Sequence, residues 1–91
     1  MLRITENFEN GNAIRLRLDG TVSLEAFEEL TEICGRHQLA NRRTIIVDMA
    51  GVSFMHDDAA RQMAKMRGET LRIINCSPFI ATLLDTVGRM D

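Results

Sequence analysis

The side chains in this sequence with the most chemical potential are three consecutive residues, His56, Asp57 and Asp58. An imidazole beside two carboxylates could bind Mg²⁺ or Zn²⁺, or it could act as a general base. Adjacent residues seldom point at one centre, however, and Asp48 is the only plausible further ligand, since His37 is expected in a different loop. A metal-dependent or acid–base enzyme at these residues is therefore an alternative, while our main expectation is a protein without catalytic residues, metal or cofactor.

Other patterns typical of enzymes are absent from the sequence. It contains no glycine-rich loop of the kind that binds phosphates and no Ser/His/Asp or Cys/His arrangement. Cys34 and Cys76 lack a CxxC partner, so we expect two buried, reduced thiols rather than a disulfide or a zinc site.

The composition narrows the class of protein further. The chain has 91 residues, and its 11 basic and 13 acidic side chains give a formal net charge of −2. A chain of this length supports a single core, so we expect one domain over residues 1–91. The balanced charge and the absence of Trp and Tyr argue against nucleic-acid binding. No apolar run approaches the roughly 20 residues that span a membrane, and no signal peptide is recognisable, so we expect a cytoplasmic protein.

The first half of the chain predicts two strands and a helix. Alternating apolar and polar residues indicate strands near residues 2–8 and 13–19, and Asn10-Gly11 predicts a tight antiparallel hairpin because both residues tolerate positive φ. A helix follows, with Ser23 as its N-cap. Its apolar stripe recurs at helical spacing at Leu24, Phe27, Leu30 or Thr31, and Cys34.

The second half alternates strands and helices. Residues 44–48 are a β-branched run that suits a buried parallel strand, and a helix beginning near His56 follows. Residues 71–74 predict another strand, after which Ser77 and Pro78 open a last helix that Gly88 ends. The last helix has an expected inward face of Phe79, Ile80, Leu83, Leu84 and Val87. The order is ββαβαβα, whose sites usually gather where strands end and helices begin, here between Asp48 and Arg61.

The segment of residues 48–59, DMAGVSFMHDDA, resembles the signature of the STAS domain, the family of bacterial anti-sigma factor antagonists and of the cytoplasmic tails of anion transporters. In that family a buried strand ending in Asp precedes a turn, Val-x-Phe-Met/Ile, and then Asp-Ser-Ser/Thr-Gly at the start of a helix. Residues 18–20 and 75–80 resemble further family motifs. The resemblance implies an α/β fold with a four-stranded mixed sheet and helices packed on it.

The resemblance also implies a regulatory switch that has lost its hydroxyl. His56, Asp57, Asp58 and Ala59 stand where the family has Asp, a phosphorylatable Ser, Ser or Thr, and Gly. In the family a partner serine kinase, often the anti-sigma factor itself, phosphorylates that Ser and so releases the STAS domain. The nearest hydroxyl here is Ser53, expected in the turn before the helix. Asp57 either imitates the phosphorylated state, with Asp58 adding a second charge, or only stabilises the helix start.

The function that the resemblance implies is a non-enzymatic protein-binding module, similar to an anti-sigma factor antagonist that regulates bacterial transcription by partner switching. The expected partner is an anti-sigma factor or a related serine kinase, with no nucleic acid and no membrane insertion. The alternative within the family is the cytosolic STAS subunit of an ABC-type lipid transport system, which would bind transporter subunits. The residues expected to contact the partner are Phe54, Met55, His56, Asp57, Asp58 and Arg61.

Overall fold

The computed structural model describes residues 2–41, 44–68 and 70–89. Its elements, in chain order, are β1 (Leu2–Asn10), β2 (Ala13–Val22), α1 (Leu24–Asn41), β3 (Thr44–Met55), α2 (Asp57–Met66), β4 (Leu71–Ile74) and α3 (Pro78–Arg89). The predicted order ββαβαβα is therefore confirmed. None of the helices in these residues is long and apolar enough to cross a membrane.

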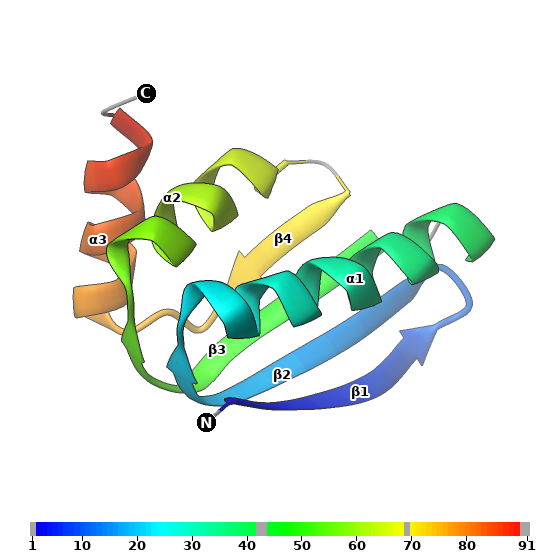
Figure 1. Ribbon diagram of the computed structural model, residues 1–91. Helices are drawn as coiled ribbons and strands as arrows, with labels where there is room; N and C mark the ends of the chain where they lie inside the picture. The colour runs from blue at the N-terminus through cyan, green and yellow to red at the C-terminus, as the bar shows by residue number, and fades with distance from the viewer. Residues whose placement is uncertain (1, 42–43, 69, 90–91) are drawn as a thin grey trace.

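The strands form one four-stranded mixed sheet with the order β1-β2-β3-β4. β1 pairs with β2 antiparallel, whereas β2–β3 and β3–β4 are parallel pairs. Each parallel pair is joined through a helix, α1 or α2. Figure 1 shows α1 lying across one face of the sheet, with α2 beside it and α3 packed on α2.

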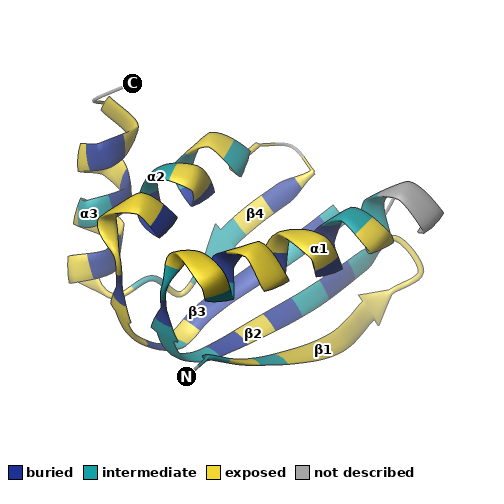
Figure 2. Ribbon diagram, in the orientation of Figure 1, coloured by how far each residue is buried: buried dark blue, intermediate teal, exposed yellow. Residues whose placement is uncertain are grey.

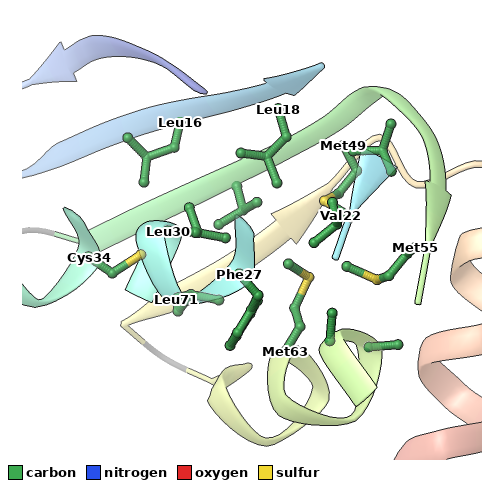
Figure 3. Close-up of a cluster of buried hydrophobic side chains, with 14 of the residues drawn as sticks. Leu16, Leu18, Val22, Phe27, Leu30, Cys34, Met49, Met55, Met63 and Leu71 are labelled. Carbon is green, nitrogen blue, oxygen red and sulfur yellow. The ribbon is translucent and has the colours of Figure 1, made fainter. Parts of the chain in front are cut away.

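One hydrophobic core fills the space between the sheet and the helices (Figures 2 and 3). The strands contribute alternate residues to it, because successive side chains of a strand point to opposite faces. Burying each large aliphatic side chain contributes about 1.5–3 kcal/mol before the entropic cost of folding. Fully buried core residues include Ile14, Leu16 and Leu18 of β2, Ile45, Val47 and Met49 of β3, and Leu30, Met63, Ile80 and Leu84 of the helices.

The β1–β2 hairpin forms as predicted, but its turn conformation differs from the expectation. Among the described residues, positive φ angles occur at Gly20 and Asn75, not at Asn10 or Gly11. Instead, the backbone N–H of Asn12 donates to Asn10 Oδ1 at 2.7 Å, so the Asn side chain closes the turn.

The predicted helix starts are confirmed by their caps. The backbone N–H of Ala26 donates to Ser23 Oγ and that of Ile80 donates to Ser77 Oγ, both at 3.2 Å. One position was predicted wrongly, because His37 lies on α1 and not in a loop. α3 includes Gly88, predicted as its stop, and its described residues end one position later at Arg89.

β3 is much longer than predicted, because it continues beyond Asp48 to Met55. The strand remains paired with β2 past an irregularity at which Asp19 lies opposite Gly51. A Cβ at Gly51 would lie 2.8 Å from the carbonyl oxygen of Leu18, so only glycine lets the two strands stay this close. Ser53 consequently lies within β3 rather than in a turn, and its hydroxyl donates to the Gly20 carbonyl at 3.3 Å.

Candidate functional site

The candidate site lies where β3 ends and α2 begins. The backbone N–H of His56 donates to the Val22 carbonyl at 3.0 Å, which ties the N-cap of α2 to the end of β2. Ala59 and Ala60 are fully buried and hold the first turn of α2 on the core. Ala59 stands where the STAS signature has Gly, and its small side chain is fully buried against the core. The first turn of α2 thus directs Asp57 and Asp58 outward, where both are exposed.

Asp58 and Asp57 differ in their relation to the helix backbone. The first N–H groups of a helix have no partner within the helix, and a nearby carboxylate can satisfy one. Asp58 does so, because its Oδ1 accepts the N–H of Ala59 at 2.8 Å, whereas His56 forms no side-chain cap. Asp57 forms no hydrogen bond with a described residue, so its carboxylate is available to a partner.

Three exposed rings meet beside this helix start. Phe54, near the end of β3, stacks on Phe79 with ring centroids 6.2 Å apart and planes inclined by 21°. The ring of His56 meets Phe54 edge-on at 5.3 Å. Phe54 is 44% and Phe79 55% exposed, so the cluster presents apolar surface to solvent.

Phe79 is the functional candidate that the sequence reasoning missed, since it was assigned to the inward face of the last helix. Ile80, Leu84 and Val87 already form a complete buried stripe at positions i, i+4 and i+7. Phe79 lies outside that stripe, in the first turn directly after Pro78. The buried stripe is complete without Phe79, and this was the signal that could have revealed Phe79 as a surface residue.

Five of the six predicted partner-binding residues line one open hollow of about 500 Å³, namely Phe54, His56, Asp57, Asp58 and Arg61. The sixth was predicted wrongly. Met55 is 0% exposed, because the alternation along β3 turns its side chain inward, where Figure 3 shows it with the core residues Val22 and Met63. We call the five residues of the hollow together with Phe79 the aromatic site.

Asp48 has a structural environment of its own. It is 4% exposed, and its Oδ1 accepts the Ala50 backbone N–H at 3.0 Å and the Asn75 side-chain amide at 3.1 Å. The Ala50 hydrogen bond chiefly lowers the pKa of Asp48; burial opposes this, while Asn75 and the nearby Arg15 and Arg17 add to it. Asp48 therefore links β3 to the residue that follows β4, and it is not at the end of its strand.

The geometry does not support the metal-dependent alternative. Asp48 and Met55 lie seven residue steps apart along β3, which is roughly 23 Å of extended strand at about 3.3 Å per residue. His37 is held elsewhere, by Glu6 of β1 at 2.6 Å. Within residues 2–41, 44–68 and 70–89, no three His, Cys, Asp or Glu side chains gather in a way that could hold a metal ion.

Both cysteines are free thiols, but their burial differs from the expectation in one case. Cys34 is buried in the core, and this burial raises its pKa to about 11. Cys76 was also predicted to be buried, yet it is only half-buried because it lies in the turn between β4 and α3. Burial raises the pKa of Cys76 as well, so neither thiol has the lowered pKa of a reactive cysteine.

The arrangement of strands and helices defines a STAS-like α/β fold, which confirms the predicted fold class. A solved structure with this fold is the anti-sigma factor antagonist SpoIIAA in its unphosphorylated form, at a TM-score of 0.68 and 18% sequence identity, over 91% of this chain and 82% of that one. The sequence matches no model of a protein family and no curated protein. At this identity the likeness to SpoIIAA shows a common fold.

Proposed function

We propose that this protein is a non-enzymatic regulatory module that binds a protein partner through the aromatic site, in the manner of an anti-sigma factor antagonist. The observation that carries the proposal is the exposed stack of Phe54 and Phe79 beside the start of α2. The resemblance to the STAS signature supports a regulatory switch at the same helix start. We propose a bacterial, cytoplasmic setting and a role in partner switching that controls transcription.

The physical support comes from the chemistry of the aromatic site. Contiguous apolar surface with a polar rim is typical of protein-binding surfaces, and aromatic side chains are enriched at their centres. Phe54 and Phe79 supply such a centre, while His56, Asp57 and Arg61 supply charged or polar groups around it. An open hollow of this kind suits a side chain of a protein partner better than an enclosed substrate.

We further propose that Asp57 holds the regulatory switch permanently in the state that a phosphorylated serine would produce. A phosphoserine at this helix start would carry about −1.5 to −2 charges, and the two adjacent carboxylates of Asp57 and Asp58 together carry a similar charge. Since Asp58 already accepts a backbone N–H of the helix, Asp57 is the carboxylate free to act on a partner. We expect Asp57→Ser or Asp57→Ala to change the affinity for the partner by about tenfold or more. If both variants bind the partner with the same affinity as the wild type, Asp57 is not a switch residue.

The experiment that tests partner binding begins with site-specific photo-crosslinking. A photoreactive residue replaces Phe79 in the full chain, and the same residue replaces Glu32, which is exposed on α1, as a control. A protein captured in native cytosol from position 79 but not from position 32 is identified by mass spectrometry, purified and titrated with the wild type. We expect Phe54→Ala and Phe79→Ala to lower the affinity at least about tenfold. Leu24→Ala, which removes a partly exposed apolar side chain from α1, should leave it unchanged.

The identity of the captured protein separates the two family alternatives. A histidine-kinase-like anti-sigma factor supports the main proposal, whereas a permease or ATPase subunit supports the lipid-transport alternative. Incubation with this partner and ATP should leave Ser53 and Asp57 unmodified by mass spectrometry. Undiminished affinity in both phenylalanine variants would refute the aromatic site as the binding surface.

A further inference from the structure

A second surface, independent of the aromatic site, lies on the opposite edge of the sheet from β4. β1 is the edge strand, and among the described strands it pairs only with β2. The N–H and C=O groups on its outer edge are therefore a template for another strand. Figure 2 shows β1 as almost entirely exposed, and Phe8, at 63%, is more exposed than Leu24, Phe54 or Phe79.

The sequence of β1 is complementary to itself in one antiparallel register. If Glu6 lies opposite its own copy on a two-fold axis, Arg3 lies opposite Glu9 of the second copy and Ile4 opposite Phe8 of the second copy. The register with β2 places Ile4 and Phe8 on one face of β1 and Arg3 on the other. Glu9 lies where this register shifts, and its ion pair with Arg15 places it on the face of Arg3. Ile4 and Phe8 lie opposite the buried residues Leu18 and Ile14, on the core side. Arg3 and Glu9 lie on the other side, opposite Asp19 and next to Arg15 respectively.

We propose that β1 is a self-association strand, and that two copies of this protein pair antiparallel along β1 to form one sheet continuous across a two-fold dimer. The register centred on Glu6 creates two Arg3–Glu9 ion pairs and two Ile4–Phe8 contacts. Cross-strand pairs of these types each contribute roughly 0.2–1 kcal/mol in sheets, and the two-fold symmetry doubles every one of them.

Neighbouring registers lack this complementarity. A slip that keeps the faces matched moves one strand by two residues and brings Arg3 opposite Asn7 and Ile4 opposite Glu6. Both the ion pair and the apolar contact are then lost, and a charged carboxylate faces an apolar side chain. The charge pattern of β1 therefore selects a single register for the dimer.

The helices leave room for the second copy. α1 packs over β2 and β3 and reaches β1 through His37, whose ring contacts Glu6 and meets Phe8 edge-on. Figure 1 shows β1 as the outermost strand at the free margin of the sheet. Strands lie about 4.8 Å apart, so an added strand continues the sheet in its own plane, beyond the helix layer. Regular pairing of β1 with β2 runs from Leu2 to Phe8, which includes Ile4 and the axis at Glu6.

One feature at the axis opposes association and provides a distinctive test. Two Glu6 side chains face each other across the two-fold axis, and like charges directly opposite one another destabilise a strand pair. Each carboxylate is held by His37 of its own copy, with Nε2 and Oε1 2.6 Å apart. Glu6→Gln removes the repulsion and keeps a side chain that can bond to His37, so it should tighten the dimer.

Sedimentation velocity of the full chain over a range of concentrations, with circular dichroism to verify folding, tests the proposal. We expect a reversible monomer–dimer equilibrium that Arg3→Glu and Glu9→Arg each weaken at least about tenfold. The double variant Arg3→Glu/Glu9→Arg should associate at least about threefold more tightly than either single variant, because it rebuilds both intermolecular ion pairs with reversed sign. It should stay weaker than the wild type, because each copy loses its own ion pair between Glu9 and Arg15. Glu6→Gln should strengthen association by about threefold or more.

The control is Arg72→Glu, which reverses an exposed charge on the other edge strand, β4, and should change nothing. A chain that stays monomeric at every concentration overturns the proposal. So does a double variant that associates no more tightly than the single variants, or a dimer that Arg72→Glu disrupts while Arg3→Glu does not. None of these outcomes bears on partner binding at Phe54 and Phe79.

Discussion

Phe54 and Phe79 stack on each other, with ring centroids 6.2 Å apart, although they lie on different elements, β3 and α3. The contact joins the end of a central strand to the first turn of the last helix, beside the start of α2. Both rings remain about half exposed, so their contact with each other leaves much of their apolar surface open to solvent. This exposed pair of rings gives the aromatic site its apolar surface beside the start of α2.

Truncating Phe79 should separate binding from stability. Phe79→Ala removes a half-exposed ring and should lower the free energy of unfolding by less than about 1 kcal/mol. Its neighbour Ile80 is 0% exposed, so Ile80→Ala should cost about 2–5 kcal/mol. Urea unfolding of the two variants measures the difference. A large loss of stability in Phe79→Ala would mean that Phe79 is mainly a core residue and would weaken the binding proposal.

The two adjacent carboxylates should differ in their effect on stability. Asp58→Ala removes the acceptor for the Ala59 N–H and should destabilise the protein by about 0.5–2 kcal/mol, as the loss of a helix cap does. Asp57→Ala removes no such bond and should have a clearly smaller effect. Thermal unfolding of both variants at one pH provides the comparison. If Asp57→Ala proves the more destabilising, then Asp57 and not Asp58 stabilises the helix start.

Asp48 should make stability depend on pH in the acidic range. Its pKa is lowered in the folded protein, chiefly by the hydrogen bond from Ala50. The unfolded chain therefore binds the proton more readily, so this contribution to stability is complete above the ordinary pKa of Asp and is lost as the pH falls through the folded value. Urea unfolding of the wild type at a series of pH values between neutral and acid should show this loss.

Asp48→Asn is the matched variant for this measurement. It should be less stable than the wild type at neutral pH, because it lacks the charge that the Ala50 N–H, Asn75 and Arg15 favour, and its stability should fall less steeply toward acid. Parallel curves for the two proteins would show that other carboxylates cause the acid sensitivity.

Gly51 should tolerate no side chain. A Cβ there would lie 2.8 Å from the Leu18 carbonyl oxygen, in addition to overlapping the Asp19 side chain, so Gly51→Ala should destabilise the protein by about 1–3 kcal/mol. Gly35 provides the control, because a Cβ at this position on α1 meets nothing within 4 Å. Gly35→Ala should stabilise the protein by roughly 0.5–1 kcal/mol, since alanine favours a helix interior. Chemical denaturation of both variants tests the contrast, and a neutral Gly51→Ala would refute the close approach of β2 and β3.

Much of the fold was predictable because its signals are local. The hairpin, the order of elements and the caps at Ser23 and Ser77 follow from residues that lie within a few positions of one another. The motif of residues 48–59 likewise indicated the STAS-like fold. Most of the aromatic site could be predicted as well, because five of its six residues lie within the short segment 54–61.

The errors occurred where one element depends on another. β3 reaches Met55 because β2 continues to pair with it, and Met55 turns inward because that pairing sets the alternation of the strand. The exposure of Phe79 depends on which face of α3 packs on α2, and its contact with Phe54 depends on how the two helices sit at the end of β3. The local periodicity of the sequence carries no information on how elements that are distant in the chain pack on one another. Local sequence signals are therefore enough to predict which elements form and where α2 begins, whereas the packing of one element on another sets which side chains reach the surface together.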